Sequence, residues 1–136
     1  MITALIDLLG AYYQAGDFAQ VATVARGMLS AIPGDLVALQ FLGLAYYRSG
    51  RIDDARQVFR QVAQQLDQTD PGPVVGSSEL ASDISYREAT RPGSGLADGW
   101  YRIGKLLKGW RFTKPAALAF RAAMAARGTS PVKTPA

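Results

Sequence analysis

The sequence predicts an all-α protein of three stacked helix-turn-helix units, with about six helices and an inserted loop. Three observations predict this fold. A pattern of apolar residues occurs twice in succession, and a third copy follows after an inserted segment. Within each copy the apolar residues are three or four positions apart, which places them on one face of a helix. The repeat period, about 34 residues, is typical of paired helices that stack.

The first two copies match at one constant shift along the chain. The matched pairs are Leu5 with Leu39, Leu8 with Leu42, Tyr12 with Tyr46, and Gly16 with Gly50. The two glycines follow the apolar stripe, where the first helix of each unit must end and the chain must reverse. Glycine suits such a place because it tolerates positive φ. We therefore expect units over about residues 2–35 and 36–69.

The third copy matches the second at another constant shift and is expected to span about residues 97–128. The matched pairs are Leu39 with Trp100, Leu42 with Ile103, Gly43 with Gly104, Ala55 with Ala116, and Phe59 with Phe120. Arg111 stands where the other copies have the turn glycine, so we expect this turn to be built differently. Thr113 is the expected N-cap of the last helix, and Gly128 is expected to end it.

The spacing of these residues resembles a known repeat. The second copy reads Leu39-x2-Leu42-Gly43-x2-Tyr46 and then Ala55-x3-Phe59, and the third reads Trp100-x2-Ile103-Gly104 and then Ala116-x3-Phe120. This pattern resembles the tetratricopeptide repeat over roughly residues 2–69 and 97–128. The resemblance implies one domain over residues 1–136, folded as a right-handed α-solenoid. It also implies a protein–protein interaction module, such as an adaptor, a chaperone or an accessory subunit of a larger complex.

The inserted segment, residues 70–96, begins and ends with clusters of Pro and Gly. These residues interrupt helices, although the stretch from Ser78 to Ala89 could form a short helix. Two interpretations remain open. The insertion is either a mobile surface loop or a segment whose Leu80, Ile84 and Tyr86 dock onto the solenoid or a partner. The tail, residues 129–136, contains two prolines and is not expected to cap the stack.

In the family that the sequence resembles, the first helices of successive repeats line a concave groove. Carried over by position, the groove would present Ile6, Tyr13, Gln40, Phe41, Leu44, Tyr47, Arg48, Tyr101, Arg102, Lys105 and Lys108. Its aromatic middle and basic end fit a partner peptide with apolar anchors and an acidic end. The alternative is that Phe41 or Tyr47 packs between adjacent first helices and that the basic cluster is simply solvated.

The end of the stack is a second candidate surface. The last helix is rich in alanine, and Leu118, Ala122 and Ala125 would lie on its uncovered face. A face of small residues suits close contact with another helix, so self-association or a larger assembly is one interpretation. The alternative is that surface alanines simply favour the helix and need no partner.

Composition excludes several kinds of chemistry. The chain has no Cys and no His, so it has no thiolate nucleophile, imidazole base, disulfide or Cys/His zinc site. We therefore expect that the protein is not an enzyme and that it has no metal site and no cofactor. No basic leader precedes an apolar segment, and no apolar run is long enough to cross a bilayer. We therefore expect a cytoplasmic protein without a transmembrane segment.

The charge is unevenly distributed. Residues 1–70 carry five Arg and seven Asp, whereas residues 71–136 carry ten Lys or Arg and four acidic residues. The basic C-terminal half suggests an acidic partner, a nucleic acid or an anionic membrane surface. No block of Lys and Arg and no Gly-rich phosphate loop is present, which makes nucleic acid the weaker interpretation.

Overall fold

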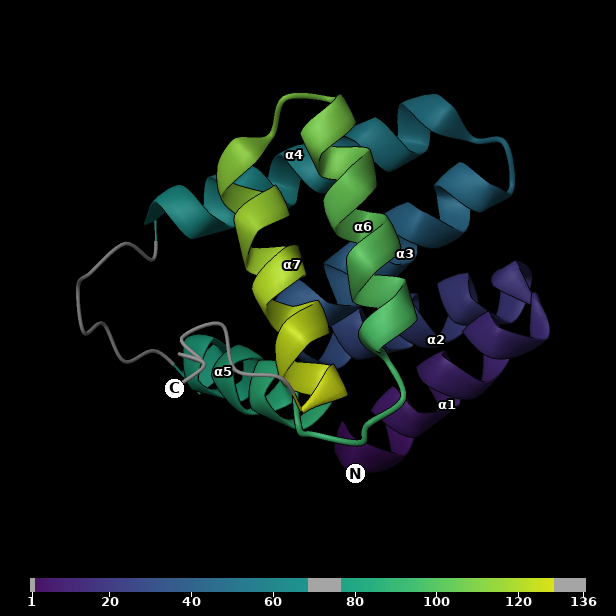
Figure 1. Ribbon diagram of the computed structural model, residues 1–136, viewed down its shortest axis with the longest axis vertical. Coiled ribbons are helices and arrows are strands. Elements are labelled where there is room, and N and C mark those ends of the chain that lie inside the picture. The colour runs from purple at the N-terminus through teal and green to yellow at the C-terminus, as the bar shows by residue number, and fades with distance from the viewer. Residues whose placement is uncertain (1, 69–76, 129–136) are drawn as a thin grey trace, which may run out of the picture.

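The computed structural model describes the backbone of residues 2–68 and 77–128, and the side chains of residues 3–66 and 82–128. The described residues contain no strand and form seven helices, namely α1 (Ile2–Ala15), α2 (Phe18–Ala31), α3 (Leu36–Arg48), α4 (Ile52–Gln68), α5 (Ser77–Ala89), α6 (Ala97–Gly109) and α7 (Thr113–Arg127) (Figure 1). The prediction of an all-α helical-repeat fold is confirmed.

The helices pair as hairpins that pack on one another. α1 packs with α2, α3 with α4, and α6 with α7, while α2 also packs with α3. The third hairpin contacts the second through like helices, α6 against α3 and α7 against α4. In Figure 1 the α6–α7 hairpin runs across α3 and α4 at a steep inclination. α3 is therefore the central helix, with α2, α4, α5 and α6 around it.

The second and third hairpins share the same close packing between their two helices. A Cβ atom added at Gly43 would lie 2.7 Å from the ring of Phe59, and one added at Gly104 would lie 2.7 Å from the ring of Phe120. Each glycine therefore lets a phenylalanine ring lie directly on the backbone of the partner helix. This contact explains why the two residue types recur together in the sequence.

The three turns between paired helices have one geometry. The turn residues Gly16, Gly50 and Arg111 have φ of +78°, +87° and +67°. In each turn the next residue donates a backbone hydrogen bond five residues back, namely Asp17 to Tyr12 at 2.9 Å, Arg51 to Tyr46 at 2.8 Å and Phe112 to Leu107 at 2.9 Å. The expectation of a different third turn is wrong, because Arg111 adopts the left-handed conformation that glycine adopts in the others.

The ends of α7 agree only in part with the prediction. Gly128 ends the helix with φ +84°, as expected for a left-handed C-cap. The expected N-cap is wrong, because Thr113 is already the first helical residue and Phe112 holds the cap position without a side-chain hydrogen bond. Phe112 instead packs its ring against Trp110, with centroids 6.3 Å apart.

The insertion contains a helix, α5, that packs against α1 and α3. The ring of Tyr86 lies 5.7 Å from that of Trp100, and its hydroxyl donates a hydrogen bond to the carbonyl of Leu118 at 3.1 Å. The mobile-loop interpretation is thus wrong for residues 77–89. The docking interpretation holds for Tyr86 but not for Ile84, which is 42% exposed. The side chain of Leu80 lies outside the described residues.

Candidate partner-binding site

The structure buries much of the groove that the sequence predicts. The predicted groove residues that are at most 7% exposed are Ile6, Tyr13, Gln40, Phe41 and Leu44. They are not available to a partner in this structure, which corrects that part of the prediction. The physical reason is that α5 and α6 pack against the first two hairpins on this face, so its apolar side chains become part of the core.

Phe41 shows how the face is covered. Its ring packs edge-on against Trp100 of α6, with centroids 5.4 Å apart, and against Tyr13 of α1 at 6.2 Å. A Cβ atom added at Gly99 would lie 2.8 Å from the ring of Phe41, so α6 begins in direct contact with it. The alternative considered from the sequence, in which Phe41 packs between first helices, is therefore the correct one.

A row of aromatic rings continues from this contact in both directions. The row runs through Phe18, Tyr13, Phe41, Trp100 and Tyr86, with neighbouring centroids 5.4–6.2 Å apart. Such pairs contribute roughly 0.5–1.5 kcal/mol each beyond the burial of their area. The aromatic middle that was expected to anchor a partner instead joins α2, α1, α3, α6 and α5 to one another.

An open part of the predicted groove remains between α3 and α6. It is a surface hollow of about 440 Å³ lined by Leu44, Tyr47, Arg48, Arg102, Lys105, Leu106, Gly109 and Trp110. We call it the α3–α6 hollow. Leu44 is buried at its base, and Tyr47 is 40% exposed at its side. Five of the predicted groove residues therefore come together here, although they lie on two helices far apart in the chain.

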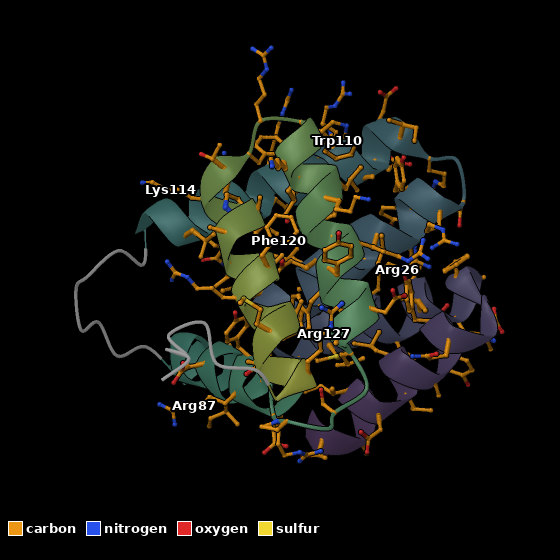
Figure 2. All side chains as sticks on the ribbon, viewed as in Figure 1. Arg26, Arg87, Trp110, Lys114, Phe120 and Arg127 are labelled. Atoms are coloured by element: carbon orange, nitrogen blue, oxygen red, sulfur yellow. The ribbon has the colours of Figure 1, made fainter. Side chains whose placement is uncertain are left out.

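Sequence reasoning missed Leu106, Gly109 and Trp110, which also line the hollow. Their spacing could have found the first two, because residues 102, 105, 106 and 109 lie on one face of a helix. Trp110 follows α6, and its ring packs against Tyr47 at 6.2 Å and Phe59 at 5.6 Å. Figure 2 shows it at the tip of the α6–α7 hairpin.

Two predicted residues on α6, Tyr101 and Lys108, do not line the hollow. The ring of Tyr101 is 40% exposed and lies 5.6 Å from the ammonium of Lys105 and 5.6 Å from the guanidinium of Arg127. Lys108 is exposed. The hollow therefore includes only one side of α6.

The cations of the hollow are held in place by their own contacts. Arg48 donates a hydrogen bond to the hydroxyl of Tyr13 at 3.4 Å and lies 4.7 Å above the ring of Phe18. Arg102 pairs with Asp98 at 3.2 Å. Burial raises the pKa of the Tyr13 hydroxyl above its usual value of 10.0, although Arg102 and Arg48 oppose the shift. The hydroxyl is therefore neutral at physiological pH. The residues that line the hollow include three cations and no acidic residue, and Asp98 neutralises one of these cations from outside the lining.

The far end of the face is closed around a buried carboxylate. Asp35 caps α3, and its Oδ2 accepts hydrogen bonds from the amide of Ala38 at 2.9 Å and from the hydroxyl of Ser85 in α5 at 3.3 Å. Burial raises the pKa of Asp35, and hydrogen bonds from Ala38, Ser85 and Ser82 oppose the shift. Its Oδ1 has no hydrogen-bond partner at normal distance.

The predicted end-of-stack surface is largely covered. Ala122 is fully buried, whereas Leu118 and Ala125 are half-buried. α7 packs against α6 and α4. The backbone carbonyl of Leu118 accepts a hydrogen bond from the hydroxyl of Tyr86 in α5. Ala122 is therefore core rather than contact surface, which corrects the prediction of an open alanine face.

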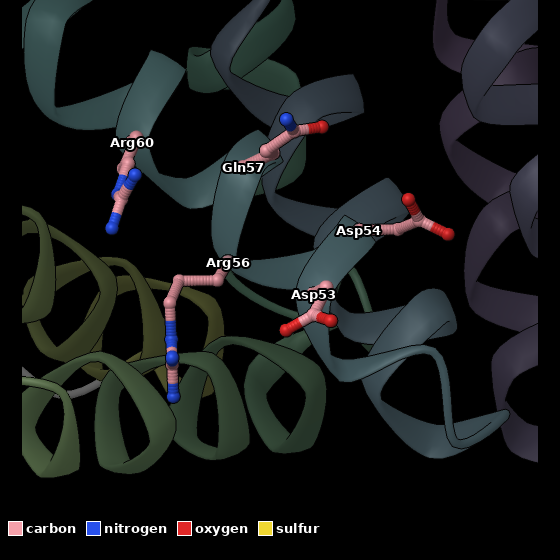
Figure 3. A pocket seen from close by; sticks show the side chains of 5 residues that line it. All are labelled: Asp53, Asp54, Arg56, Gln57 and Arg60. Carbon is pink, nitrogen blue, oxygen red and sulfur yellow. The ribbon is translucent and has the colours of Figure 1, made fainter.

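A second hollow, of about 260 Å³, lies on α4 and is lined by Asp53, Asp54, Arg56, Gln57 and Arg60 (Figure 3). All five residues belong to one helix and carry both signs of charge. Asp54 pairs with Arg51 at 2.7 Å, and the guanidinium of Arg56 lies 5.1 Å from the ring of Trp110. Across the described part of the chain, acidic residues form no cluster of three that could hold a metal ion. We interpret this surface as a solvated helix face.

Comparison with known families agrees with the repeat pattern. A family model described as tetratricopeptide repeat matches residues 6–71, which include most of α1 and all of α2, α3 and α4. Residues 6–71 are thus similar to tetratricopeptide repeats. Tetratricopeptide repeats are generally protein–protein interaction modules and typically non-enzymatic scaffolds. No curated protein matches the chain.

The described helices also bear on membrane association. None of the helices in residues 2–68 and 77–128 combines the length and apolar character that crossing a bilayer requires.

Proposed function

We propose that this tetratricopeptide-repeat protein is a protein-binding module that holds an acidic, partly apolar segment of a partner in the α3–α6 hollow. One observation carries the proposal. The hollow gathers Arg48, Arg102 and Lys105 beside the rings of Tyr47 and Trp110, and no acidic residue lines it.

The chemistry of the hollow fits such a segment. Carboxylates of the partner would form charge-assisted hydrogen bonds with Arg48 and Arg102, which are stronger than neutral hydrogen bonds. An apolar partner side chain would lie against the rings of Tyr47 and Trp110. Arginine and aromatic residues of this kind commonly contribute roughly 2 kcal/mol or more each to an interface.

The existing contacts of the cations lower the cost of binding. Tyr13 and the ring of Phe18 fix Arg48, while Asp98 fixes Arg102. Long side chains that are already ordered lose less conformational entropy when a partner arrives. In this proposal residues 1–136 act as one domain, and the protein is an adaptor, a chaperone or an accessory subunit in the cytoplasm.

A nucleic acid or an anionic membrane surface is the second candidate partner. Residues 97–128 carry seven Lys or Arg and a single Asp, which favours any polyanion. Binding to phosphates would show a steep dependence on salt, because each neutralised phosphate releases counterions. Binding of a peptide at one localised site would depend less steeply on salt concentration.

A fluorescent peptide rich in Glu, with one Leu and one Trp, tests the proposal by anisotropy. We expect the substitutions R48A, R102A and K105A each to weaken binding by roughly tenfold, which is the loss expected for a charged anchor. The matched control is R60A, which removes an exposed cation on α4 outside the α3–α6 hollow. Equal losses for R60A and R48A would reject the hollow as the site. Tighter binding of a labelled single-stranded oligonucleotide, lost steeply with salt, would favour the second candidate.

A further inference from the structure

α5 covers the end of the concave face opposite the α3–α6 hollow. Besides the ring contact of Tyr86 with Trp100, hydrogen bonds join the described residues of α5 to the rest of the chain. They include the hydrogen bonds Ser85 to Asp35 at 3.3 Å, Tyr86 to the Leu118 carbonyl at 3.1 Å, Trp100 to the Ala89 carbonyl at 3.4 Å, and Thr3 to Glu88 at 3.2 Å. They reach four other helices, α1, α6, α7 and the capped start of α3.

α5 buries little apolar surface through the side chains that the structure describes. Of its residues 82–89, those that are fully buried are Ser85 and Ala89, both small. By contrast, α6 buries Trp100 and Leu107 completely. Because apolar burial is the main force that holds helices together, residues 82–89 of α5 are held by less apolar contact than α6 is.

Two buried polar side chains, Asp35 and Gln40, are not fully hydrogen-bonded, although Ser85 and Ser82 of α5 both donate to the carboxylate of Asp35. Oδ1 of Asp35 has no hydrogen bond, and neither does the side-chain amide of Gln40, five residues further along. Both residues are fully buried. An unpaired buried polar atom favours any state in which water or a ligand reaches it. Gln40 is also a position at which the sequence predicts contact with a partner.

We propose that α5 is a displaceable internal ligand, and that a partner helix takes its place on the seat formed by α1, the start of α3, Trp100 and Leu118. This inference rests on the proposed function, because it extends the same binding face.

The seat determines what the partner helix must present. Asp35 accepts a hydrogen bond from a hydroxyl, as it does from Ser85. The residue that follows this hydroxyl residue should be aromatic, because its ring would pack on Trp100 as the ring of Tyr86 does. The indole N–H of Trp100 reaches the backbone carbonyl of Ala89, and a small residue there permits that approach. The expected partner helix therefore carries a hydroxyl, an aromatic ring and an alanine at positions i, i+1 and i+4 of one face.

Native-state hydrogen exchange of the unmodified chain tests whether α5 leaves. We expect the amides of residues 85–89 to exchange through a partial opening, with a weaker urea dependence than the amides of residues 42–45 in α3. Exchange of both sets through global unfolding alone, with one common urea dependence, would overturn the proposal.

A labelled peptide with the sequence of residues 77–90 tests whether the seat accepts a helix from outside. We expect Y86A, which weakens the resident helix, to bind the peptide roughly tenfold more tightly than the unmodified chain does. The matched control is I84A, which alters an exposed side chain of the same helix and should leave peptide binding unchanged. If Y86A does not fold, S85E serves instead, because it places a second carboxylate against Asp35.

A cross-link gives the opposite test. The chain has no cysteine, so T3C and E88C can be joined selectively by a short bismaleimide and fix α5 to α1. We expect the cross-linked chain to lose binding of the residue 77–90 peptide and to keep binding of the acidic peptide at the α3–α6 hollow. Absence of peptide binding to folded Y86A and S85E, or equal binding to the cross-linked chain, would refute the displaceable helix. Loss of only the acidic-peptide binding would instead refute the proposed function.

Discussion

The α3–α4 and α6–α7 hairpins are built alike inside but differ outside. Both place a phenylalanine ring on a glycine backbone, and both reverse the chain through a left-handed residue with the same hydrogen bond. α3 is buried at every position from Val37 to Ala45. α6 exposes its cations and is buried only at Gly99, Trp100, Ile103, Gly104 and Leu107. The repeat pattern thus determines the hairpin, and the neighbours determine which of its faces a partner can reach.

The largest expected effect breaks the shared glycine–phenylalanine contact. G43A places a methyl group against the fully buried ring of Phe59 and should lower the free energy of unfolding by about 2 kcal/mol. G104A makes the same collision with Phe120, which is half-buried and can move outward, so we expect a loss of about 1 kcal/mol. Urea unfolding monitored by circular dichroism measures both.

The matched control for these variants is G27A in α2, where an added Cβ meets nothing within 4 Å. Alanine favours the helix over glycine by about 1 kcal/mol, so this variant should become more stable. If G43A and G104A also gained stability, the glycines would not be required by packing and the contact would not explain the repeat.

A second prediction concerns the different starts of α3 and α6. Asp35 caps α3 from within the core, whereas Leu96 precedes α6 without a side-chain cap. Because the folded pKa of Asp35 is raised above its usual 3.8, its contribution to stability is greatest below pH 3.8 and falls as pH rises through the folded pKa. The free energy of unfolding of the unmodified chain, relative to D35N, should therefore decrease with rising pH over that window.

Urea unfolding of both chains from about pH 3 to pH 8 measures this difference. D35A separates capping from charge, since alanine removes the cap that asparagine keeps, and should be about 1 kcal/mol less stable than D35N at every pH. A constant difference between the unmodified chain and D35N across the range would show that burial of the carboxylate has no energetic consequence.

The smallest expected effect concerns the turns. R111G relieves the positive φ that arginine adopts at +67° and should raise the free energy of unfolding by about 1 kcal/mol. G50R imposes the same strain on the second hairpin, where an added Cβ meets open space, and should lower it by a similar amount. Thermal unfolding of the pair measures both. Two shifts of the same sign would mean that charge, rather than backbone strain, dominates at this turn.

Sequence reasoning could place residues on one face of a single helix. Arg102 and Lys105, which the sequence places together on one side of a helix, both line the hollow. The prediction failed for Phe41 and Gln40 because α3 has apolar neighbours on nearly every side, and helical periodicity cannot show how many neighbours a helix has. The turn at Arg111 was misjudged because residue type was taken to decide a conformation that the packing of α6 on α7 imposes.

The sequence by itself determined the three hairpins, since apolar spacing, small residues beside aromatic ones and helix-ending glycines act over a few turns of chain. Only the tertiary structure decided which surface stays open. Asp35 and Ser85 are fifty residues apart in the chain, yet they form a hydrogen bond. Tyr13 and Arg48 are thirty-five residues apart and also form one. Such contacts form when whole helices pack, so no local pattern could show that one end of the face would be filled by α5 and the other left open and basic.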